Sequence, residues 1–407
     1  MENGILHVDM NNFYASVETL YAPQYRDVPM AVAGDKESRH GIILAKNMLA
    51  KEKGVQTAEP IWQAMRKCPG LQLVPPHHDR YAKFSALAKK IYCRYTDRVE
   101  AFSLDECWLD VYGSERLFGT GREIAEDIRR RVKEELGLTV SIGVSFNKIF
   151  AKLGSDYKKP DATTVISREN FKQIVWPLPV TDLLFVGKAA AKVLKPYGVT
   201  TIGALAAFDR GALVELLGKQ GGQLWEYANG LENSPVSPAG TYTVPKSVGN
   251  GETFPRNLVR RDEIARGVAE LADEVAVRLR QCGMKATTLQ LTIRDPKFKD
   301  ICRQRPLDCP TNTARELSQT AMDILAQCWK SGAPIRAITL TAHNLIPEED
   351  ASEQLGFFQD ARPERRERVE KLERTMDAIR SKYGRGAVTV ATLTPEKAPD
   401  DDGEVPF

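Results

Sequence analysis

The segment FSLDECWLDV, residues 102–111, carries two adjacent carboxylates, Asp105 and Glu106, at the head of a run of large apolar residues. The apolar run predicts a buried strand over residues 106–112. A strand that buries one face has no reason to begin with two neighbouring acids unless a cation lies beside them, because a buried charge without a partner is costly. The segment therefore predicts a strand whose first residues hold a cation.

The elements around this strand alternate between strand and helix. Residues 5–10 form a short predicted strand with Asp9 at its C-terminal end. Residues 122–136 repeat apolar side chains every four positions, which predicts an amphipathic helix, and the β-branched run at 138–145 predicts the next strand. In a split βαβ sheet the strands of Asp9 and of Asp105–Glu106 are neighbours, so three carboxylates should meet at one edge. The predicted class is α+β, with helices on one face of a mainly antiparallel sheet.

The rest of the chain extends this pattern. Residues 12–67 are expected to be helical and mixed, with a strand GIILA at 41–45, and residues 167–235 are expected to be helical with glycine turns. A second α+β unit is predicted over residues 242–345. Its expected elements are strands at 243–253, 286–294 and 335–343 and helices at 260–282 and 311–330. A basic helix near 362–383 and a disordered end complete the prediction.

The composition indicates a cytoplasmic protein of several domains. A chain of 407 residues exceeds one compact core, so about two to four domains are expected. The sequence has no apolar run of about 18 residues and no signal-peptide pattern at its start, so we expect no membrane partner. Seven scattered cysteines without CxxC spacing indicate reduced thiols rather than a zinc site.

The charge is unevenly distributed along the chain. Residues 346–407 carry 10 Lys/Arg and 15 Asp/Glu, a net charge of −5, so the formal +3 of the whole chain leaves +8 on residues 1–345. A basic body with an acidic end suits a polyanionic partner. Many basic proteins bind no polyanion, so the charge alone does not decide the partner.

The three carboxylates are a candidate metal site. Neither His nor Cys accompanies them, and oxygen-only ligands favour Mg²⁺ or Mn²⁺ over zinc or copper. Two such ions a few ångströms apart would stabilise the attacking and leaving oxygens of a phosphoryl displacement. The alternative is that these acids cap turns or pair with surface lysines, and an Asp-Glu pair alone does not exclude it.

Three longer segments carry a specific resemblance. Residues 8–18 (VDMNNFYASVE), 102–110 (FSLDECWLD) and 141–160 (SIGVSFNKIFAKLGSDYKKP) resemble the signature segments of the Y-family translesion DNA polymerases, most closely the bacterial DNA polymerase IV branch. The resemblance implies a right-hand polymerase with a ferredoxin-like palm, small helical fingers, a helical thumb with a helix-hairpin-helix and an α+β little finger. The implied boundaries are palm 1–10 and 77–166, fingers 11–76, thumb 167–235, linker 236–241, little finger 242–345 and C-terminal tail 346–407.

The resemblance also implies the catalytic residues. Asp9, Asp105 and Glu106 would bind two Mg²⁺ ions, for which Mn²⁺ can substitute, and the Met10 backbone carbonyl would complete one shell. The ions would lower the pKa of the primer 3′-hydroxyl and neutralise charge on the triphosphate. Lys159 would reach the triphosphate.

Four successive residues after the first strand are implied neighbours of the nucleotide. Tyr14 occupies the family's steric-gate position, where the ring lies beneath the deoxyribose and excludes a 2′-hydroxyl. Asn11, Asn12 and Phe13 are candidate nucleotide-binding residues, although Phe13 is also typical of a core aromatic.

The expected fingers depart from the family pattern. Ala45, Met48 and Lys51 stand where Thr or Ser, then Tyr, then Arg usually contact the phosphates. Lys51 can still act as a point charge but lacks the bidentate fork of arginine. Ile42 and Leu44 are the expected roof over the nascent base pair.

Two further segments are implied DNA and partner contacts. The FVGK turn, with Gly187 and Lys188, resembles a helix-hairpin-helix that holds backbone phosphates, and the little finger carries 16 Lys/Arg against 11 Asp/Glu. Residues 354–358 (QLGFF) resemble the bacterial sliding-clamp motif Gln-Leu-Ser/Asp-Leu-Phe but depart from it at two positions. The expected clamp contacts are Gln354, Leu355, Phe357 and Phe358. The alternative is that this segment packs on the little finger.

The predicted function is translesion synthesis by a monomeric, low-fidelity DNA polymerase. Its expected partners are primer–template DNA, deoxynucleoside triphosphates and the sliding clamp. One alternative is a catalytically inactive, clamp-bound scaffold, against which the presence of all three acids and Lys159 argues. Another is a palm-domain nucleotidyl cyclase, which would not need the two DNA-binding units expected over residues 167–345.

Overall fold

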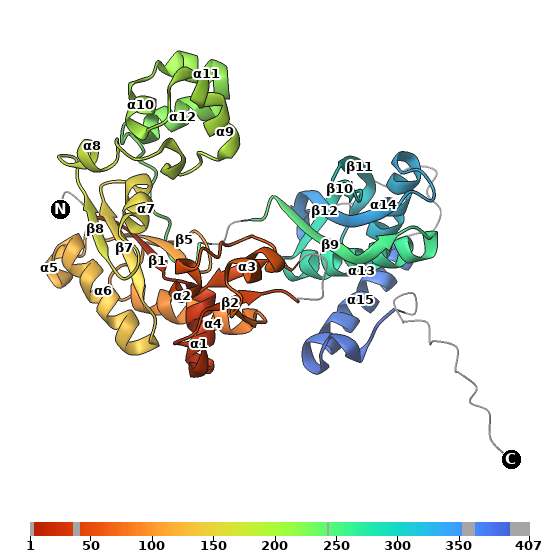
Figure 1. Ribbon diagram of the computed structural model, residues 1–407. Helices are drawn as coiled ribbons and strands as arrows, with labels where there is room; N and C mark the ends of the chain where they lie inside the picture. Colours follow the sequence, from red (N-terminus) through yellow and green to blue (C-terminus); the bar gives the residue numbers. More distant parts are fainter. Residues whose placement is uncertain (1–3, 36–40, 242–243, 352–362, 391–407) are drawn as a thin grey trace. The chain divides into compact units, whose positions relative to one another are not determined.

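The computed structural model describes residues 4–35, 41–241, 244–351 and 363–390. The chain divides into two compact units, one up to Tyr242 and one from Thr243 onward, and each is described by itself. Within the described residues, the first unit holds two sheets and a layer of helices, and the second holds one sheet with its helices (Figure 1). The predicted α+β class is confirmed.

A five-stranded sheet forms the centre of the first unit, in the order β5-β6-β1-β7-β8. Its strands are β1 (Ile5–Met10), β5 (Val99–Ala101), β6 (Glu106–Asp110), β7 (Val140–Ser145) and β8 (Thr163–Ile166). β1 pairs antiparallel with both β6 and β7, and β7 pairs parallel with β8. The predicted adjacency is confirmed, because Asp9 and Glu106 are Cα partners across β1 and β6.

Helices cover both faces of this sheet, which corrects the prediction of helices on one face. They are α4 (His78–Tyr92), α5 (Glu115–Phe118), α6 (Gly121–Leu136) and α7 (Lys148–Tyr157). α4 and α6 share a core with Leu6 and Val8 of β1, whereas α7 packs on the opposite face, where His7 contacts Ser155 (Figure 1). Because side chains alternate along a strand, Asp9 shares the face covered by α7.

The close packing of α7 depends on Gly143 in β7. A Cβ there would lie 1.9 Å from the carbonyl oxygen of Ala151 and 2.6 Å from the amide nitrogen of Ser155. Since these are backbone atoms of the helix, any side chain would push α7 away from the sheet. Gly143 therefore sets how near the side chains of α7 come to those of β1.

Residues 11–76 form a mixed layer, as predicted for residues 12–67, and the strand predicted at 41–45 is present as β3, although β2 and β4 add more strand than the helical fingers implied by the resemblance. Its elements are α1 (Phe13–Tyr21), the 3₁₀ turn η1 (Pro23–Tyr25), β2 (Met30–Ala33), β3 (Ile43–Lys46), α2 (Met48–Glu52), α3 (Ile61–Lys67) and β4 (Gln72–Val74), with the sheet order β3-β2-β4. β2 is a buried Met-Ala-Val-Ala run. Four buried residues are too few for periodicity to distinguish a strand from a helix.

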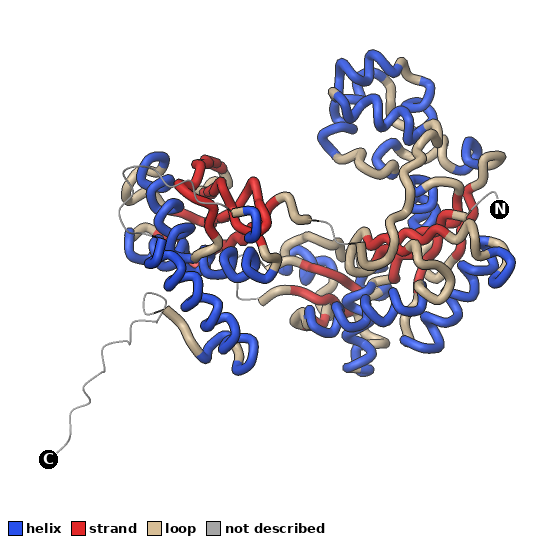
Figure 2. Tube along the Cα trace, turned by 180° about the vertical axis from the view of Figure 1, so that it is seen from behind, coloured by secondary structure: helices blue, strands red, loops and turns tan. Residues whose placement is uncertain are grey.

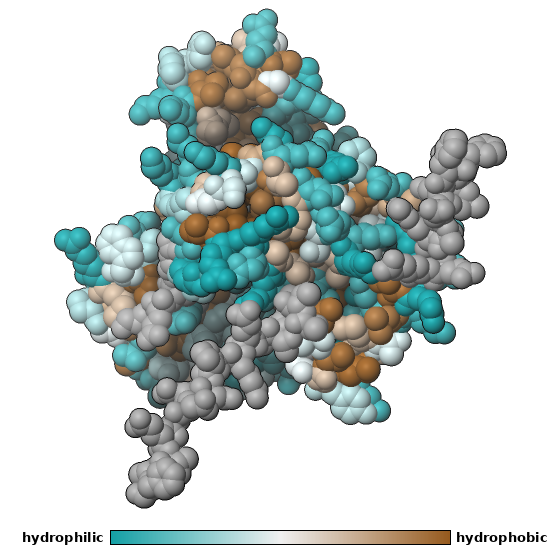
Figure 3. Space-filling model, turned by 90° about the vertical axis from the view of Figure 1, so that its right-hand side faces the viewer, coloured by the Kyte–Doolittle hydropathy of each residue, from teal (hydrophilic) through white to brown (hydrophobic). Residues whose placement is uncertain are grey.

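Residues 167–235 are helical, as predicted. The elements are α8 (Phe171–Ile174), η2 (Val180–Asp182), α9 (Lys188–Leu194), η3 (Lys195–Tyr197), α10 (Ile202–Ala207), α11 (Arg210–Leu217) and α12 (Lys219–Ala228). Their core continues into α7 through Ile149, Phe150 and Leu153. Apolar side chains show between polar ones on the surface of this helical layer (uppermost part of Figure 3).

Residues 236–239, which were expected to begin a linker, belong to the first unit. Val236 is fully buried against Trp108 of β6. The amide of Ser237 donates a hydrogen bond of 2.8 Å to the carboxylate of Glu100 in β5. These contacts attach the segment to the edge of the five-stranded sheet, so the connection between the units begins later than predicted.

The second unit is a four-stranded antiparallel sheet in the order β11-β10-β12-β9, with two helices on one face (Figure 2). Its elements are β9 (Ser247–Leu258), α13 (Arg261–Gln281), β10 (Met284–Arg294), β11 (Asp300–Thr311), α14 (Ala314–Cys328), β12 (Ile335–Pro347) and η4 (Glu348–Asp350). β9 starts and ends later than predicted, and β11 was missed. β11 is a mostly exposed edge strand that contains Pro306, which only an edge position tolerates, so it lacks the buried alternation that predicts strands.

The predicted helix near 362–383 is confirmed as α15 (Pro363–Tyr383), followed by η5 (Arg385–Ala387). It packs on the second unit, although the sequence assigned it to a separate tail. Ion pairs join it to α13, β10 and α14: Arg280–Asp377 at 2.6 Å, Lys285–Glu370 at 2.7 Å and Arg366–Glu316 at 2.6 Å. Among the described residues, no helix has the length and apolarity needed to cross a membrane.

Candidate active site

The predicted acids lie at one end of the five-stranded sheet. Asp9 is 6% exposed, and Glu106 opposite it is half-buried. The amide of Met10 donates a hydrogen bond of 3.1 Å to the carbonyl oxygen of Asp105, which continues the pairing one residue beyond β6. Two strands that are far apart in the sequence thus bring the acids together.

Two lysines from α7 and the turn after it fill the space beside these acids. The Nζ atom of Lys152 lies 3.3 Å from Asp9 Oδ2 and 3.1 Å from Asp156 Oδ2, and it also contacts Glu106 Oε1. The Nζ atom of Lys159 lies 2.7 Å from Asp9 Oδ2 and 2.8 Å from Asp156 Oδ1. Lys159 was predicted from the sequence, whereas Lys152 and Asp156, which are one helical turn apart within the third signature segment, were not.

The pKa values show how the acids and lysines depend on each other. Burial, together with a hydrogen bond shared with Asp9, raises the pKa of Glu106 to about 7 despite the nearby Lys152. Burial alone would lower the pKa of Lys152, but Asp156, Asp9 and Glu106 outweigh it and raise that pKa. Crowded, partly buried carboxylates require cations to stay ionised. The ammonium group of Lys152 offsets only part of the burial of Glu106, whose pKa stays raised.

The three carboxylates were predicted to converge, but Asp105 does not lie close enough to the other two to share one ion with them. Its Oδ1 atom accepts a hydrogen bond of 2.6 Å from the hydroxyl of Ser103. Across the described ranges, no three Asp, Glu, His or Cys side chains lie close enough to hold one ion. The side-chain atoms that pair with the two ammonium groups are nevertheless all carboxylate oxygens, and these are potential metal ligands. Such a set fits a hard cation such as Mg²⁺ or Mn²⁺ and does not suit zinc.

The ring of Tyr14 is held in place by Tyr81 of α4. The two rings stack with centroids 3.9 Å apart and planes 9° apart. The Tyr81 hydroxyl donates a hydrogen bond of 2.6 Å to the buried carboxylate of Glu18, which also pairs with Arg80 at 2.9 Å. Burial, followed by the charge of Asp105, raises the pKa of Tyr14. The candidate gate thus rests on an anchored aromatic that the sequence analysis did not identify.

The turn between β1 and α1 and the start of α1 contain three residues that were predicted to contact the nucleotide. Asn11 is buried, and its side chain hydrogen-bonds the hydroxyls of Thr139 and Ser141. Asn12 adopts a left-handed conformation (φ 50°), which asparagine tolerates better than most residues. Phe13 is buried in the core, as its alternative interpretation predicted. The turn joins the end of β1 to α1, which begins four residues after Asp9.

Comparison with known proteins identifies the family. Residues 8–156 match the impB/mucB/samB family, and residues 245–357 match the C-terminal domain of that family. The chain belongs to the impB/mucB/samB family. Both matches lie within described structure over most of their length, and the first contains the acids of β1 and β6.

Relatives and a solved structure agree with this assignment. DNA polymerase IV of Acetivibrio thermocellus is 47% identical over 94% of this chain and 96% of its own length. DNA polymerase IV 1 of Bacillus subtilis strain 168 is 37% identical over 97% of this chain and 94% of its own length. A Y-family DNA polymerase chimera of Dbh and Dpo4 has the same fold, with a TM-score of 0.74 at 23% identity, covering 84% of this chain and 99% of that one. The predicted Y-family, DNA polymerase IV branch and right-hand fold are confirmed.

The fingers of this family member carry a second pair of cations. Lys51 is exposed on α2 and, within the described part of the chain, no carboxylate pairs with it. Lys46, at the end of β3, donates to the hydroxyl of Thr57 at 2.9 Å, and burial followed by Lys51 lowers its pKa. The predicted roof residues differ in setting: Ile42 is 39% exposed, and Leu44 packs against the palm core.

The thumb presents its predicted turn to the palm. Gly187 is the N-cap of α9, and Lys188 is the first residue of that helix. Residues 181–187 form one wall of a pocket of about 490 Å³, and Lys152 and Asp156 of α7 form part of the other. The turn therefore shares a pocket with Lys152, which pairs with Asp9 and Glu106.

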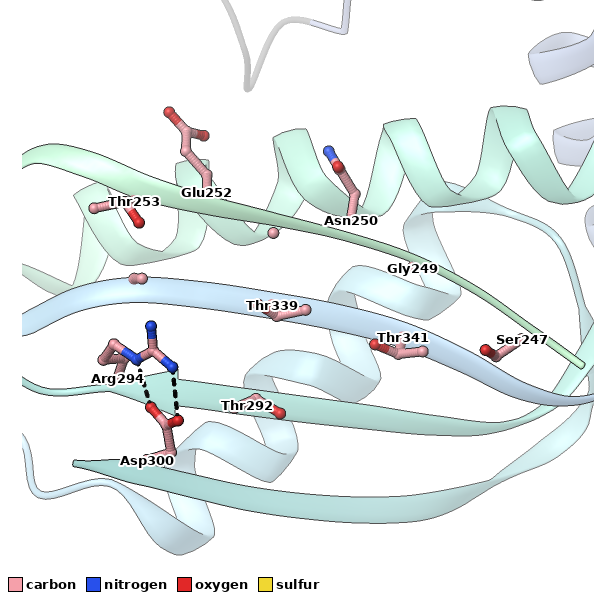
Figure 4. A pocket seen from close by; sticks show the side chains of 12 residues that line it. Ser247, Gly249, Asn250, Glu252, Thr253, Thr292, Arg294, Asp300, Thr339 and Thr341 are labelled. Atoms are coloured by element: carbon pink, nitrogen blue, oxygen red, sulfur yellow. Dashed lines mark hydrogen bonds and ion pairs between the residues drawn. The ribbon is translucent and has the colours of Figure 1, made fainter. Parts of the chain in front are cut away.

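The helix-free face of the little-finger sheet forms a shallow pocket of about 510 Å³ (Figure 4). Thr339 and Thr341 of β12 lie on this face, opposite Gly251 and Gly249 of β9. A Cβ on Gly251 would lie 2.4 Å from the hydroxyl oxygen of Thr339, so any larger residue would require the Thr339 side chain to move. Glycines and threonines thus leave this part of the sheet face without bulky side chains. The predicted clamp contacts at 354–358 lie outside the described residues.

Proposed function

We propose that this protein is a template-directed DNA polymerase of low fidelity, which extends a primer 3′-hydroxyl past damaged template bases. One observation carries the proposal: Asp9 and Glu106 face each other across two strands and take up ammonium groups from Lys152 and Lys159. An acidic pocket that attracts cations is what nucleotidyl transfer requires, because negative charge develops on the transferring phosphate. The relatives named DNA polymerase IV support the same reaction.

The metal ligands we propose are Asp9, Asp105 and Glu106, with the Met10 carbonyl. Two Mg²⁺ ions bound there would lower the pKa of the primer 3′-hydroxyl and neutralise charge on the triphosphate. The ammonium groups and such ions bind the same carboxylate oxygens. Metal ions at the acids would thus release both lysines, and Lys159, which the family resemblance assigns to the triphosphate, is the one we propose to bind it.

The start of α1 is the proposed seat of the triphosphate. No side chain caps this helix end and no acid lies in its first turn, so its backbone N–H groups remain available to phosphate oxygens. The turn places them directly after Asp9. Asn11 and Asn12 shape that turn, and Phe13 anchors it in the core, so their proposed contribution is backbone position. Lys51, which is exposed on α2, supplies a further positive charge from the fingers.

Tyr14 is the proposed gate against ribonucleotides. A rigid ring beneath the sugar excludes a 2′-hydroxyl only if it cannot rotate aside, and stacking on Tyr81 supplies that restraint. Ile42 and Leu44 are the proposed roof over the nascent pair, since both lie on or beside β3.

DNA grip is proposed for the thumb turn at Gly187 and Lys188 and for the helix-free face of the little finger. On that face Arg294 is paired with Asp300 at 2.7 and 2.8 Å (Figure 4), so the charge of this arginine is already compensated. The groups that we propose this face offers to DNA are therefore the uncharged threonine hydroxyls and the backbone. Contacts of this kind hold phosphates without reading sequence, as a lesion-tolerant enzyme needs. Residues 354–358 are the proposed clamp-binding motif, on the strength of their sequence.

Primer extension with Mg²⁺ and all four deoxynucleoside triphosphates tests the proposal. We expect extension by the unaltered protein and loss of extension by Glu106→Ala. Asp110→Ala is the matched control, because Asp110 is the acid at the other end of β6. DNA binding should survive in both variants.

The two alternatives give different results in the same assay. An inactive scaffold would bind primer–template without extending it, and a cyclase would form a cyclic nucleotide in the absence of DNA. Either result from the unaltered protein would refute the proposed function.

A further inference from the structure

Phe185, in the thumb turn, combines strain with exposure. Its φ is 71°, in the left-handed region, where the Cβ of an L-residue lies too close to the following carbonyl oxygen. Glycine usually occupies such positions, and a bulky residue there is an outlier. The side chain is also 55% exposed, so core packing does not account for it. Strain retained at an exposed residue is typical of functional sites.

The turn holds this ring firmly. Leu183 and Val186 on either side are buried in the thumb core, and the amide of Val186 donates to the carbonyl oxygen of Leu183 at 3.0 Å. The Phe185 ring lies 6.1 Å from that of Tyr227 in α12, with planes 37° apart. The backbone is thus fixed by burial, and the ring is presented to solvent beside a second aromatic.

Phe185 also lines the pocket shared with α7. On the opposite wall, Lys152 pairs with Asp9 and Glu106, and Asp156 follows one turn later. The pocket therefore lies between the aromatic ring and a lysine that pairs with two of the proposed catalytic acids. A ligand that fills it must suit the cation of Lys152 beside the proposed reaction centre and must offer a flat or apolar surface to the ring of Phe185.

A primer strand has these properties. Its terminal 3′-hydroxyl reacts at the acids, its phosphates suit Lys152, and its sugars and base edges suit an aromatic face, which packs against nucleotides of any sequence. We propose that Phe185 is a positioning residue, whose ring packs against the last nucleotides of the primer strand. The inference rests on the proposed polymerase function and adds the strand and the residue that the thumb turn recognises.

The test compares Phe185→Gly and Phe185→Asn, which both suit the left-handed backbone, with Phe185→Tyr, which keeps the ring. Tyr197→Ala is the matched control, since Tyr197 is an equally exposed thumb aromatic (55%) that does not line the pocket. We expect the Gly and Asn variants to bind primer–template about five to ten times more weakly, as loss of one aromatic–nucleotide contact predicts. Their melting temperatures should stay within about 2 °C of the unaltered protein, because strain relief offsets lost packing. Phe185→Tyr and Tyr197→Ala should bind normally.

A second measurement identifies the strand. A benzophenone amino acid at position 185 should crosslink to the primer rather than to the template when the two carry different labels. Unchanged affinity in Phe185→Gly, or crosslinking to the template alone, would overturn the inference while the unaltered protein still extends primers. Failure of the unaltered protein to extend primers would instead refute the function on which the inference rests.

Discussion

Neutralising the two acids that hold Arg280 should loosen the second unit far more than breaking an exposed ion pair. The side chain of Arg280 in α13 is 4% exposed. Its Nε and Nη2 atoms lie 2.6 and 3.1 Å from the carboxylate of Asp377, its Nη1 lies 2.7 Å from the carbonyl oxygen of Asn312, and it also contacts Glu373. Both acids belong to α15. Glu373 → Gln with Asp377→Asn leaves the arginine buried with its charge uncompensated.

The size of the effect follows from burial. Removing the partners of a buried charge costs roughly 3–5 kcal/mol. Glu373 also accepts from the amide of Ala314 at 3.0 Å and so caps α14, which adds about 1 kcal/mol. We take about 4 kcal/mol, since the amides keep part of the hydrogen bonding. For a unit of this size, that corresponds to a fall of roughly 8–16 °C in melting temperature.

Hydrogen exchange followed by mass spectrometry can read the two units separately. Peptides of α13 and β10 should lose protection in the double variant, whereas those of α6 in the first unit should not change. Asp300→Asn is the matched control, because it breaks an equally well-aligned but exposed pair with Arg294, and such pairs contribute little. Adding Arg280→Met to the double variant should restore protection, since it removes the buried charge. If α13 is as protected in the double variant as in the unaltered protein, α15 is not part of this unit.

Four further predictions concern the reaction and its partners. Glu106→Ala should reduce the rate of primer extension at least a thousandfold, roughly 4 kcal/mol of barrier, while fluorescence anisotropy shows DNA binding unchanged; substantial residual extension would remove Glu106 from the catalytic set. Tyr14→Ala should raise incorporation of rCTP relative to dCTP opposite guanine, and an unaltered ratio would place the gate elsewhere. The double variant Leu355→Ala with Phe358→Ala should abolish clamp pull-down but spare extension of short primers, because docked apolar side chains contribute roughly 1.5–3 kcal/mol each; undiminished clamp binding would exclude the motif. The large roof residue Ile42 should favour bypass of minor-groove guanine adducts over cyclobutane thymine dimers, since packed side chains resist compression; insertion rates normalised to undamaged template decide this, and equal bypass of the dimer would contradict it.

The sequence pattern was sufficient to predict an element wherever residues close together in the chain decide its structure. α6 could be predicted because its apolar repeat, the capping box of Thr120 and Glu123 and the left-handed Gly137 that ends it all lie within one segment. The pairing of Asp9 with Glu106 could also be predicted, since one short strand ends and another begins with an acid, and antiparallel neighbours bring those two ends together. The same segments carried the family resemblance, so the fold could be predicted from the sequence, and the catalytic role of the acids stays a prediction from the same motifs.

Tertiary structure alone decided which side chains meet at the site. Lys152 is one of several lysines in its segment, and it reaches the acids because Gly143 lets α7 lie directly on β7. Tyr81 shows no motif, and it supports Tyr14 because α4 packs beside α1. The sequence by itself determined the elements and the chemistry of the acids, because turns, caps and periodicity act over a few residues. The face each helix covers and the partner each charge finds depend on contacts between distant segments, and only the folded chain brings those together.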